Sequence, residues 1–244
     1  MPTVNANTII AYARKIMGNL NVYDLTDADA LLFLNEAFNE AQMDLVNIRA
    51  DFFVEKSIFN SISNNQSVIQ MPLDCLLVKR IEVNFTDPTN VDYFKKCTEF
   101  DAANAPKSWD WYLKNQPKSE PMVDLRGEFA EIAPKADADY NNAIKIIYIS
   151  KSEIYDANGD KVSNQRFSAT TDLIPYPFSL YPEVLAYKMA EVITYTLGNT
   201  STIQNKALGY ERLYDKKMKK LVSGIETDLE VIVSKSVPID TRSF

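Results

Sequence analysis

The segment 156–160, Asp-Ala-Asn-Gly-Asp, places three oxygen-bearing side chains at alternate positions. This spacing resembles the beginning of a calcium loop, in which the sixth position is a glycine and the twelfth is a bidentate glutamate. Here the sixth position is Lys161 and the twelfth is Phe167. We therefore expect a plain loop or a hairpin turn, with Asn158–Gly159 as a type I′ turn, and no metal site.

Large apolar side chains alternate at Trp109, Trp111 and Leu113, which predicts one face of a strand, with Tyr112 on the other face. Flat aromatic faces stack against sugars and bases, so this strand could serve a glycan-binding module. Burial in the core of a sheet is the more common role of such a face. We favour the core and keep glycan binding as an alternative function.

Arg212, Lys216 and Lys220 follow one another at intervals of four residues, which places them on one face of a helix. They lie in the segment 206–220, which carries six basic residues against two acidic ones in a chain of formal net charge -7. Such a face could contact DNA, an acidic surface of another subunit, or solvent alone. We predict an intersubunit or DNA-facing basic face and favour the subunit contact.

Catalytic chemistry has little support in the residues. The chain has no histidine, and its six glycines form neither GxGxxG nor GxxxxGK[ST]. Cys75 and Cys97 are too few for a disulfide framework and are expected to be free thiols. Carboxylate pairs can still meet when a chain folds, as in glycosidases, so a hydrolase stays a less favoured alternative. We expect no enzyme, and therefore no catalytic residue, no cofactor and no metal ion.

The 244-residue chain is acidic, with a sequence pI near 4.8, and its hydrophobic content of 46% suits a globular core. An acidic balance argues against nonspecific coating of nucleic acid, since phosphates are bound mainly by Lys and Arg. The densest apolar stretches, 30–34 and 144–149, are too short to cross a bilayer, and the first residues lack a signal-peptide pattern. We expect a protein made in the cytoplasm, with no membrane partner.

Two helical blocks bracket the chain. The first holds a short helix at 8–17, which Gly18 can end, and a longer helix, which Thr26 can cap. Apolar residues step by three and four along the longer helix, so they share one seam. The members of this seam are Leu31, Leu34, Phe38, Ala41, Leu45 and Ile48.

The second helical block begins after the proline-rich segment 174–178. Pro182 suits the first turn of a helix, where its missing N–H is harmless, and Gly198 can end that helix. A further helix is expected from near Thr200 to Gly224.

Between the two blocks the chain is rich in β-branched and aromatic residues, in short segments separated by Asn, Pro and Gly. This pattern predicts antiparallel strands and hairpins. Arg126–Gly127 suits a tight hairpin turn. The predicted strands are 52–59, 67–71, 76–85, 108–113, 121–125, 128–132 and 144–150.

The last segment, 226–244, changes to a period of two. Its apolar residues alternate with other side chains, which predicts a strand that needs an edge to pair with, in this chain or in another. Fully extended at about 3.3 Å per residue, the segment would span ~60 Å and could reach another subunit or protein. We predict a docking arm whose contact residues are Leu229, Val231, Val233, Pro238 and Phe244.

Together these elements predict an α+β fold. Helices from 1–50 and 173–225 would form one helical bundle domain, and 51–172 would form an antiparallel β-rich domain inserted into it. Residues 226–244 would form the extended C-terminal docking arm. This order favours a structural protein that works through its surfaces.

Several local signatures recur in a fixed order along the chain. They are Ala-Leu-Leu-Phe-Leu-Asn-Glu-Ala-Phe-Asn-Glu at 30–40, the Met-Pro-Leu-Asp turn at 71–74 before the strand 78–83, Ile-Ala-Pro at 132–134, the strand 144–148, and Leu-Tyr-Pro-Glu-Val-Leu-Ala at 180–186. In this order they resemble the head-to-tail adaptor proteins of tailed bacteriophages, which include tail accessory factors, gatekeepers and tail tubular protein A. The likeness spans about residues 8–223.

The resemblance implies a structural protein of the virion, located at the head–tail junction. It implies a homo-oligomeric ring of about twelve copies that joins the portal to the tail and extends the DNA channel. The partners would be the portal protein, tail or further neck proteins, and passing DNA contacted without sequence specificity. The helical part would build the ring, the β part would face the tail, and the arm would reach the portal. A glycan-binding tail module and a tail-associated hydrolase are the alternatives.

Overall fold

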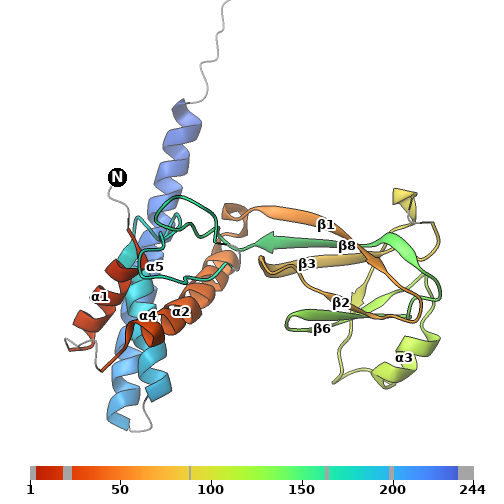
Figure 1. The fold of residues 1–244 in the computed structure, drawn as a ribbon, viewed down its shortest axis with the longest axis horizontal. Helices are drawn as coiled ribbons and strands as arrows, with labels where there is room; N and C mark the ends of the chain where they lie inside the picture. Colours follow the sequence, from red (N-terminus) through yellow and green to blue (C-terminus); the bar gives the residue numbers. More distant parts are fainter. Residues whose placement is uncertain (1–3, 19–23, 88, 163–164, 198–200, 236–244) are drawn as a thin grey trace, which may run out of the picture. The chain divides into compact units, whose positions relative to one another are not determined.

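The chain divides into two compact units, Met1–Phe52 with Ser152–Phe244, and Phe53–Lys151. The first unit is helical, and the second is built mainly from β-strands (Figure 1). Because N-terminal and C-terminal helices pack together and antiparallel sheets form separately, the predicted α+β fold class is confirmed. The computed structural model describes residues 4–18, 24–87, 89–162, 165–197 and 201–235.

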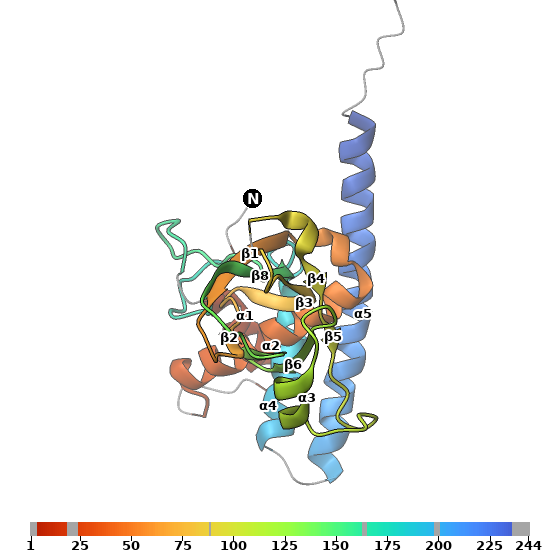
Figure 2. The ribbon, with the colours of Figure 1, turned by 90° about the vertical axis from the view of Figure 1, so that its right-hand side faces the viewer.

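Four α-helices form the described part of the helical unit. The third of these packs against each of the other three, so helices from both ends of the chain share one core (Figure 2). The cap predicted for the second helix is confirmed, because Thr26 Oγ1 accepts a hydrogen bond of 3.2 Å from the N–H of Asp29. Pro182 is the first residue of its helix, as predicted. The helices are α1 (Ala6–Ile16), α2 (Asp27–Ile48), α4 (Pro182–Leu197) and α5 (Ser201–Lys235), with the 3-10 turn η1 (Ala50–Phe52) after α2.

The buried face of α2 is broader than the predicted seam. Leu34, Phe38, Ala41 and Leu45 are buried, whereas the last member, Ile48, is 52% exposed. A straight helix has 3.6 residues per turn, so a strict seam of threes and fours drifts around it and its end turns to solvent. The buried face also includes Ala30, Ala37, Gln42 and Val46.

Residues 152–172 belong to the helical unit, although we expected them in the β-rich domain. The ring of Phe167 packs edge-on against Phe38 of α2, with 5.2 Å between ring centres. Asn35 holds the main chain of Phe167 from both sides: its Oδ1 accepts from the N–H at 2.8 Å, and its Nδ2 donates to the carbonyl at 3.0 Å. These contacts join positions 132 residues apart, which local patterns do not reveal.

The β unit contains two four-stranded sheets. The strand order is β1-β8-β3-β4 in one and β2-β7-β6-β5 in the other, and all neighbours are antiparallel except β5 and β6. Ile81 and Ile146 of the first sheet share a core with Ile132 of the second. The strands are β1 (Glu55–Ile62), β2 (Val68–Gln70), β3 (Cys75–Val83), β4 (Lys95–Lys96), β5 (Thr98–Glu99), β6 (Met122–Arg126), β7 (Phe129–Ala133) and β8 (Tyr140–Ser150), with the 3-10 turn η2 (Val91–Tyr93) before β4.

Two predicted turns have different outcomes. The hairpin between β6 and β7 is confirmed, and Gly127 within it has a φ of +62°. The prediction of a type I′ turn at Asn158–Gly159 is wrong. Such a turn needs a positive φ at both central residues, and only Gly159 has one. A carboxylate fixes this loop instead: Asp156 Oδ1 accepts from the N–H groups of Asn158 at 2.8 Å and Asp160 at 2.9 Å.

Residues 108–113, predicted as a strand, contain the start of a short helix, α3 (Trp109–Asn115). Trp109 and Leu113 are buried one turn apart, whereas Trp111 is 42% exposed. An alternation over 109, 111 and 113 also contains an i, i+4 pair, so the same side chains suit a helix. The hydrogen bond of 2.8 Å from Trp109 Nε1 to Glu131 Oε2 ties this helix to β7.

The last helix, α5, continues through Gly224 to Lys235. Gly224 was expected near the end of the helix, but it lies inside it. The ring and hydroxyl of Tyr181 lie where a β-carbon of Gly224 would stand. The glycine therefore allows a close approach between α5 and the residue that precedes α4.

The strand predicted for the C-terminal docking arm is wrong over the described residues, because Leu229, Val231 and Val233 all lie in α5. Leu229 and Val233 are four positions apart, so the sequence suits a helix as well as a strand. Helix α5 already runs through this point, and each further residue adds one hydrogen bond to a helix that needs no new nucleus. Pro238 and Phe244 lie outside the described residues.

Candidate interaction surfaces

The predicted basic face lies on α5 with its three members exposed, namely Arg212, Lys216 and Lys220. The ammonium group of Lys220 lies 5.8 Å from the centre of the Tyr181 ring, a cation–π contact. Within the part of the chain that the structure describes, no carboxylate lies within ion-pair distance of Arg212 or Lys216. Both groups are therefore available to a partner.

A neighbouring cation of α5 is used inside the fold. Lys217 Nζ lies 3.1 Å from Glu183 Oε1 and joins α5 to the first turn of α4. The hydrogen bond to Glu183 raises the pKa of Lys217 against the smaller opposing effect of burial. Lys217 therefore belongs to the packing of α4 and α5, and the basic face does not include it.

A pocket of about 450 Å³ lies between α2, α4 and α5. Four carboxylates line it, Asp44, Glu191, Glu211 and Asp215, against two ammonium groups, Lys188 and Lys219. We call this the acidic pocket. It was not identified from the sequence, because it forms only where α2 meets α4 and α5, which lie far from α2 in the chain. Its remaining lining residues are Asn47, Ile48, Tyr214 and Met218.

Lys188 is the central cation of the acidic pocket, and its side chain is 11% exposed. Its Nζ lies 2.8 Å from Glu40 Oε2, 3.3 Å from Glu191 Oε1, and 4.9 Å from the centre of the Tyr214 ring. Burial favours the neutral amine, but the two carboxylates outweigh it and raise the pKa of Lys188. Lys188 therefore stays charged and joins α2, α4 and α5.

Glu191 is only partly satisfied by this arrangement. The residue is 8% exposed, and its Oε2 has no hydrogen-bond partner among the described residues. Burial raises the pKa of Glu191, while Lys188 lowers it and the nearby Glu211 and Glu40 raise it further. This pair was not predicted from the sequence, although two charged residues at i, i+3 among the mostly apolar residues 184–193 are a signal that could have indicated it.

The floor of the acidic pocket is also polar. The Tyr214 hydroxyl of α5 donates a hydrogen bond of 2.7 Å to Asp44 Oδ2 of α2. Burial, followed by the bond to Asp44, raises the pKa of Tyr214, so the phenol stays protonated and remains a donor. One oxygen of Asp44 is thus occupied within the fold.

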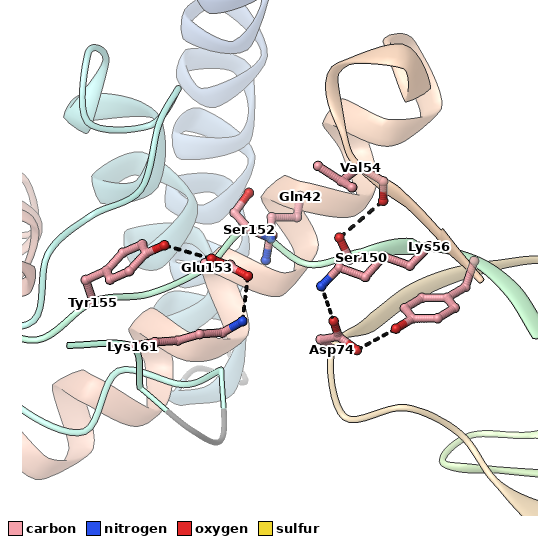
Figure 3. A network of polar contacts seen from close by, with 10 residues as sticks. Gln42, Val54, Lys56, Asp74, Ser150, Ser152, Glu153, Tyr155 and Lys161 are labelled. Atoms are coloured by element: carbon pink, nitrogen blue, oxygen red, sulfur yellow. Dashed lines mark hydrogen bonds and ion pairs between the residues drawn. The ribbon is translucent and has the colours of Figure 1, made fainter. Parts of the chain in front are cut away.

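Polar contacts also hold the segment that leaves the β unit on the helical unit (Figure 3). Gln42 Oε1 of α2 accepts a hydrogen bond of 2.7 Å from the N–H of Ser152. Glu153 accepts from the hydroxyl of Tyr155 at 2.7 Å and pairs with Lys161. These residues fix a loop to α2 and show no arrangement for chemistry.

Within the β unit, Asp74 accepts from Lys56 Nζ at 2.6 Å and from the Tyr148 hydroxyl at 2.9 Å (Figure 3). Burial acts to raise the pKa of Asp74, but the bonds from Lys56 and Tyr148 outweigh it, and the pKa is lowered. The Ser150 hydroxyl donates to the carbonyl of Val54 at 3.1 Å. These groups satisfy one another and serve the packing of β1, β3 and β8.

The residues that suggested other chemistry are arranged as follows. The carboxylate of Asp156 is taken up by main-chain N–H groups, and no cluster of three His, Cys, Asp or Glu residues that could hold a metal ion occurs in the described segments. Burial raises the pKa of Cys75 to about 11 and that of Cys97 to about 12, so both thiols are protonated at neutral pH.

The aromatic platform proposed for glycan binding does not form as predicted. Trp109 is buried and its ring lies 4.9 Å from that of Phe100, whereas Trp111 points outward with Lys107 Nζ 6.0 Å above its ring. The two indoles therefore share no face. A single exposed indole is a common surface feature and favours no glycan site by itself.

Among the described residues, no helix is both long enough and hydrophobic enough to cross a membrane. Among curated proteins, no match to the sequence was found. A family model described as SU10 adaptor protein matches residues 4–234, which covers both the helical and the β unit. The chain therefore belongs to the SU10 adaptor protein family, a family of bacteriophage head–tail adaptors.

Proposed function

We propose that copies of this chain form a closed ring that joins the portal protein to the tail and extends the channel through which DNA passes. The observation that carries this proposal is the family match over residues 4–234, since it includes every described helix and nearly the whole of α5. A ring of about twelve copies requires head-to-tail contacts between two different surfaces of each copy. The role is structural and relies on surfaces.

The docking arm, residues 226–244, is proposed to bind the portal protein. Because its first ten residues are helical, the binding mode changes from strand addition to a helix that lies in a groove. Leu229 and Val233 have the i, i+4 spacing of anchors on such a helix. Pro238 and Phe244 remain proposed contacts that follow the helix.

The β unit is proposed to face the tail or a further neck protein. It exposes several large apolar side chains, among them Phe59 at 48%, Tyr93 at 46% and Phe129 at 47%. Exposed aromatic side chains are enriched where proteins bind one another. This supports a contact surface for a protein partner and needs no site of catalysis.

The passing DNA is proposed to be contacted without sequence specificity. With a net charge of -7, the chain does not attract a polyanion strongly, which suits a channel that DNA must leave as well as enter. The basic face of Arg212, Lys216 and Lys220 is therefore assigned to a contact between copies, and DNA is the alternative.

The decisive experiment is co-production of the chain with the portal protein from the same phage. We expect a joint complex whose native mass corresponds to one portal and a ring of several copies of this chain. A chain that stays separate from the portal at all concentrations would overturn the proposal. A mutant phage that lacks the chain should yield heads and tails that do not join.

A further inference from the structure

The acidic pocket contains a buried acceptor that the fold leaves unused. Glu191 is 8% exposed, and its Oε2 receives no hydrogen bond from the described residues. A buried carboxylate oxygen without a donor is costly, because it has lost water and gained nothing in return. Glu191 is one of the residues that line an open pocket of about 450 Å³, so a donor that enters the pocket would lie next to this carboxylate.

The buried cation of the pocket, Lys188, cannot fill this role. Lys188 already lies between Glu40 and Glu191 Oε1 and over the ring of Tyr214. Glu211 and Asp215 add two carboxylates at the α5 side of the pocket, and no ion pair to either is present in the described part of the chain. The pocket thus has an excess of negative charge and an acceptor without a donor.

We propose that the acidic pocket binds a guanidinium or ammonium group from the basic face of a second copy of this chain. Among the residues of the basic face, Arg212 suits the pocket best, because its planar guanidinium group can donate to two carboxylate oxygens at once. Lys216 and Lys220 extend the same face. The inference rests on the proposed ring only in that it requires two copies to meet.

A second copy is the favoured occupant because of where the positive charge of the chain lies. Residues 206–220 hold six basic residues against two acidic ones, although the whole chain has a net charge of -7. Arg212 and Lys216 are exposed and have no carboxylate partner within the described segments. The basic face of one copy and the acidic pocket of the next are therefore complementary in charge.

The geometry of α5 makes this contact head-to-tail. Glu211 and Asp215, four positions apart, line the acidic pocket, whereas Arg212, Lys216 and Lys220 are exposed on a different side of the same helix. A copy therefore offers a donor face and an acceptor pocket that cannot meet within one molecule. Two different surfaces in contact produce a heterologous interface, which closes into a ring when the rotation permits.

Charge reversal on both surfaces tests the contact in the full-length chain. We expect E211K/D215K to weaken self-association by at least about tenfold, and R212E/K216E to do the same. The chain with all four substitutions should recover, because each reversed pocket then meets a reversed face. The four changes avoid Lys188 and Glu191, and circular dichroism verifies the fold. A milder variant, Glu191→Gln, should weaken self-association while it keeps the shape of the pocket.

Self-association is measured by sedimentation over a concentration series, and carbodiimide crosslinking identifies the contact in concentrated protein and in complexes with the portal. We expect dimer bands that contain Glu211 or Asp215 joined to Lys216 or Lys220. Dimers crosslinked only through other surfaces, or self-association unaffected by E211K/D215K, would overturn the proposed role of the acidic pocket. The proposed ring would still stand. If copies do not associate either in concentrated protein or in complexes with the portal, both the proposed pocket contact and the proposed ring are overturned.

Discussion

Gly224 of α5 lies against Tyr181, whose hydroxyl and ring occupy the place of a β-carbon on the glycine. A helix-interior glycine is normally unfavourable relative to alanine, so its presence here reflects the close approach of the two segments. Gly209, in the same helix, has no atom within 4 Å of such a β-carbon. The two glycines therefore form a matched pair.

The first prediction follows from this pair. Gly224→Ala should lower the free energy of unfolding by about 1–3 kcal/mol, because Tyr181 must move or lose its packing. Gly209→Ala should raise it by about 0.5–1 kcal/mol, because alanine loses less backbone freedom on folding. Urea unfolding of both variants measures the difference, and equal effects of the two substitutions would contradict the close approach.

A second prediction concerns the buried cation. Lys188→Met should destabilise the helical unit by about 3 kcal/mol, because Glu191 is left buried without its counter-charge. A matched variant that also removes the carboxylate, K188M/E191L, should recover much of the loss, since an apolar pair needs no desolvated charge. Recovery is read from urea midpoints, and a double variant as unstable as Lys188→Met alone would argue against this account.

The third prediction is a pH dependence that comes from Glu191. Its pKa is raised in the fold, so the unfolded chain ionises first as the pH rises. The contribution of Glu191 to stability is therefore fully present below the unfolded pKa near 4.5 and is lost as the pH rises through the higher folded pKa. Urea unfolding of the wild type and Glu191→Gln between about pH 4 and pH 7 should show a stability difference that changes with pH. A constant difference would indicate a loss of packing alone.

The fourth prediction separates the two tryptophans. Trp109→Ala should destabilise the β unit by about 3–5 kcal/mol, because it removes a buried indole and its bond to Glu131. Trp111→Ala should change stability by less than about 1 kcal/mol, because this indole is exposed. Thermal unfolding provides the comparison. The Trp111→Ala protein is also compared with the wild type on a glycan array. We expect the two proteins to give the same result, because the exposed indole forms no glycan site.

Much of the fold was predictable because its signals are local. Thr26 caps α2 from three residues away, and Pro182 starts α4 through its own missing N–H. The predictions failed where a pattern was short and ambiguous. Residues 109–113 and 229–233 each contain an alternation that is also an i, i+4 pair. The helix at 109–113 is held by the buried Trp109 and its bond to Glu131, whereas 229–233 continue the helix α5.

The candidate site was less predictable for a different reason. The exposed basic residues of α5 were visible as a periodic pattern, but the acidic pocket arises only when three helices meet. Glu40, Lys188 and Tyr214 are separated by long stretches of chain, and no local rule brings them together. The pair Lys188 and Glu191 could have been noticed in sequence, as two charges at i, i+3 among mostly apolar residues, but a local pattern does not show what they contact.

The last prediction concerns the docking arm. A helical arm presents a different set of side chains to a partner than an extended strand does. In a strand, Leu229, Val231 and Val233 would share one face, whereas in a helix Val231 lies on a different side from the other two. We therefore expect Leu229→Ala and Val233→Ala to weaken copurification with the portal protein, and Val231→Ala to leave it unchanged.

Truncation completes this test. A chain that ends at the buried residue Ile225 should remain folded and fail to bind the portal protein. A chain that ends at Lys235 retains α5 and isolates the roles of Pro238 and Phe244. If only the chain that ends at Ile225 loses portal binding, the contact belongs to the helix. If the chain that ends at Lys235 loses it as well, the last nine residues also contribute to the contact. If the chain that ends at Ile225 copurifies with the portal as well as the full-length protein, the arm is not the docking element, and another surface of the helical unit must bind the portal.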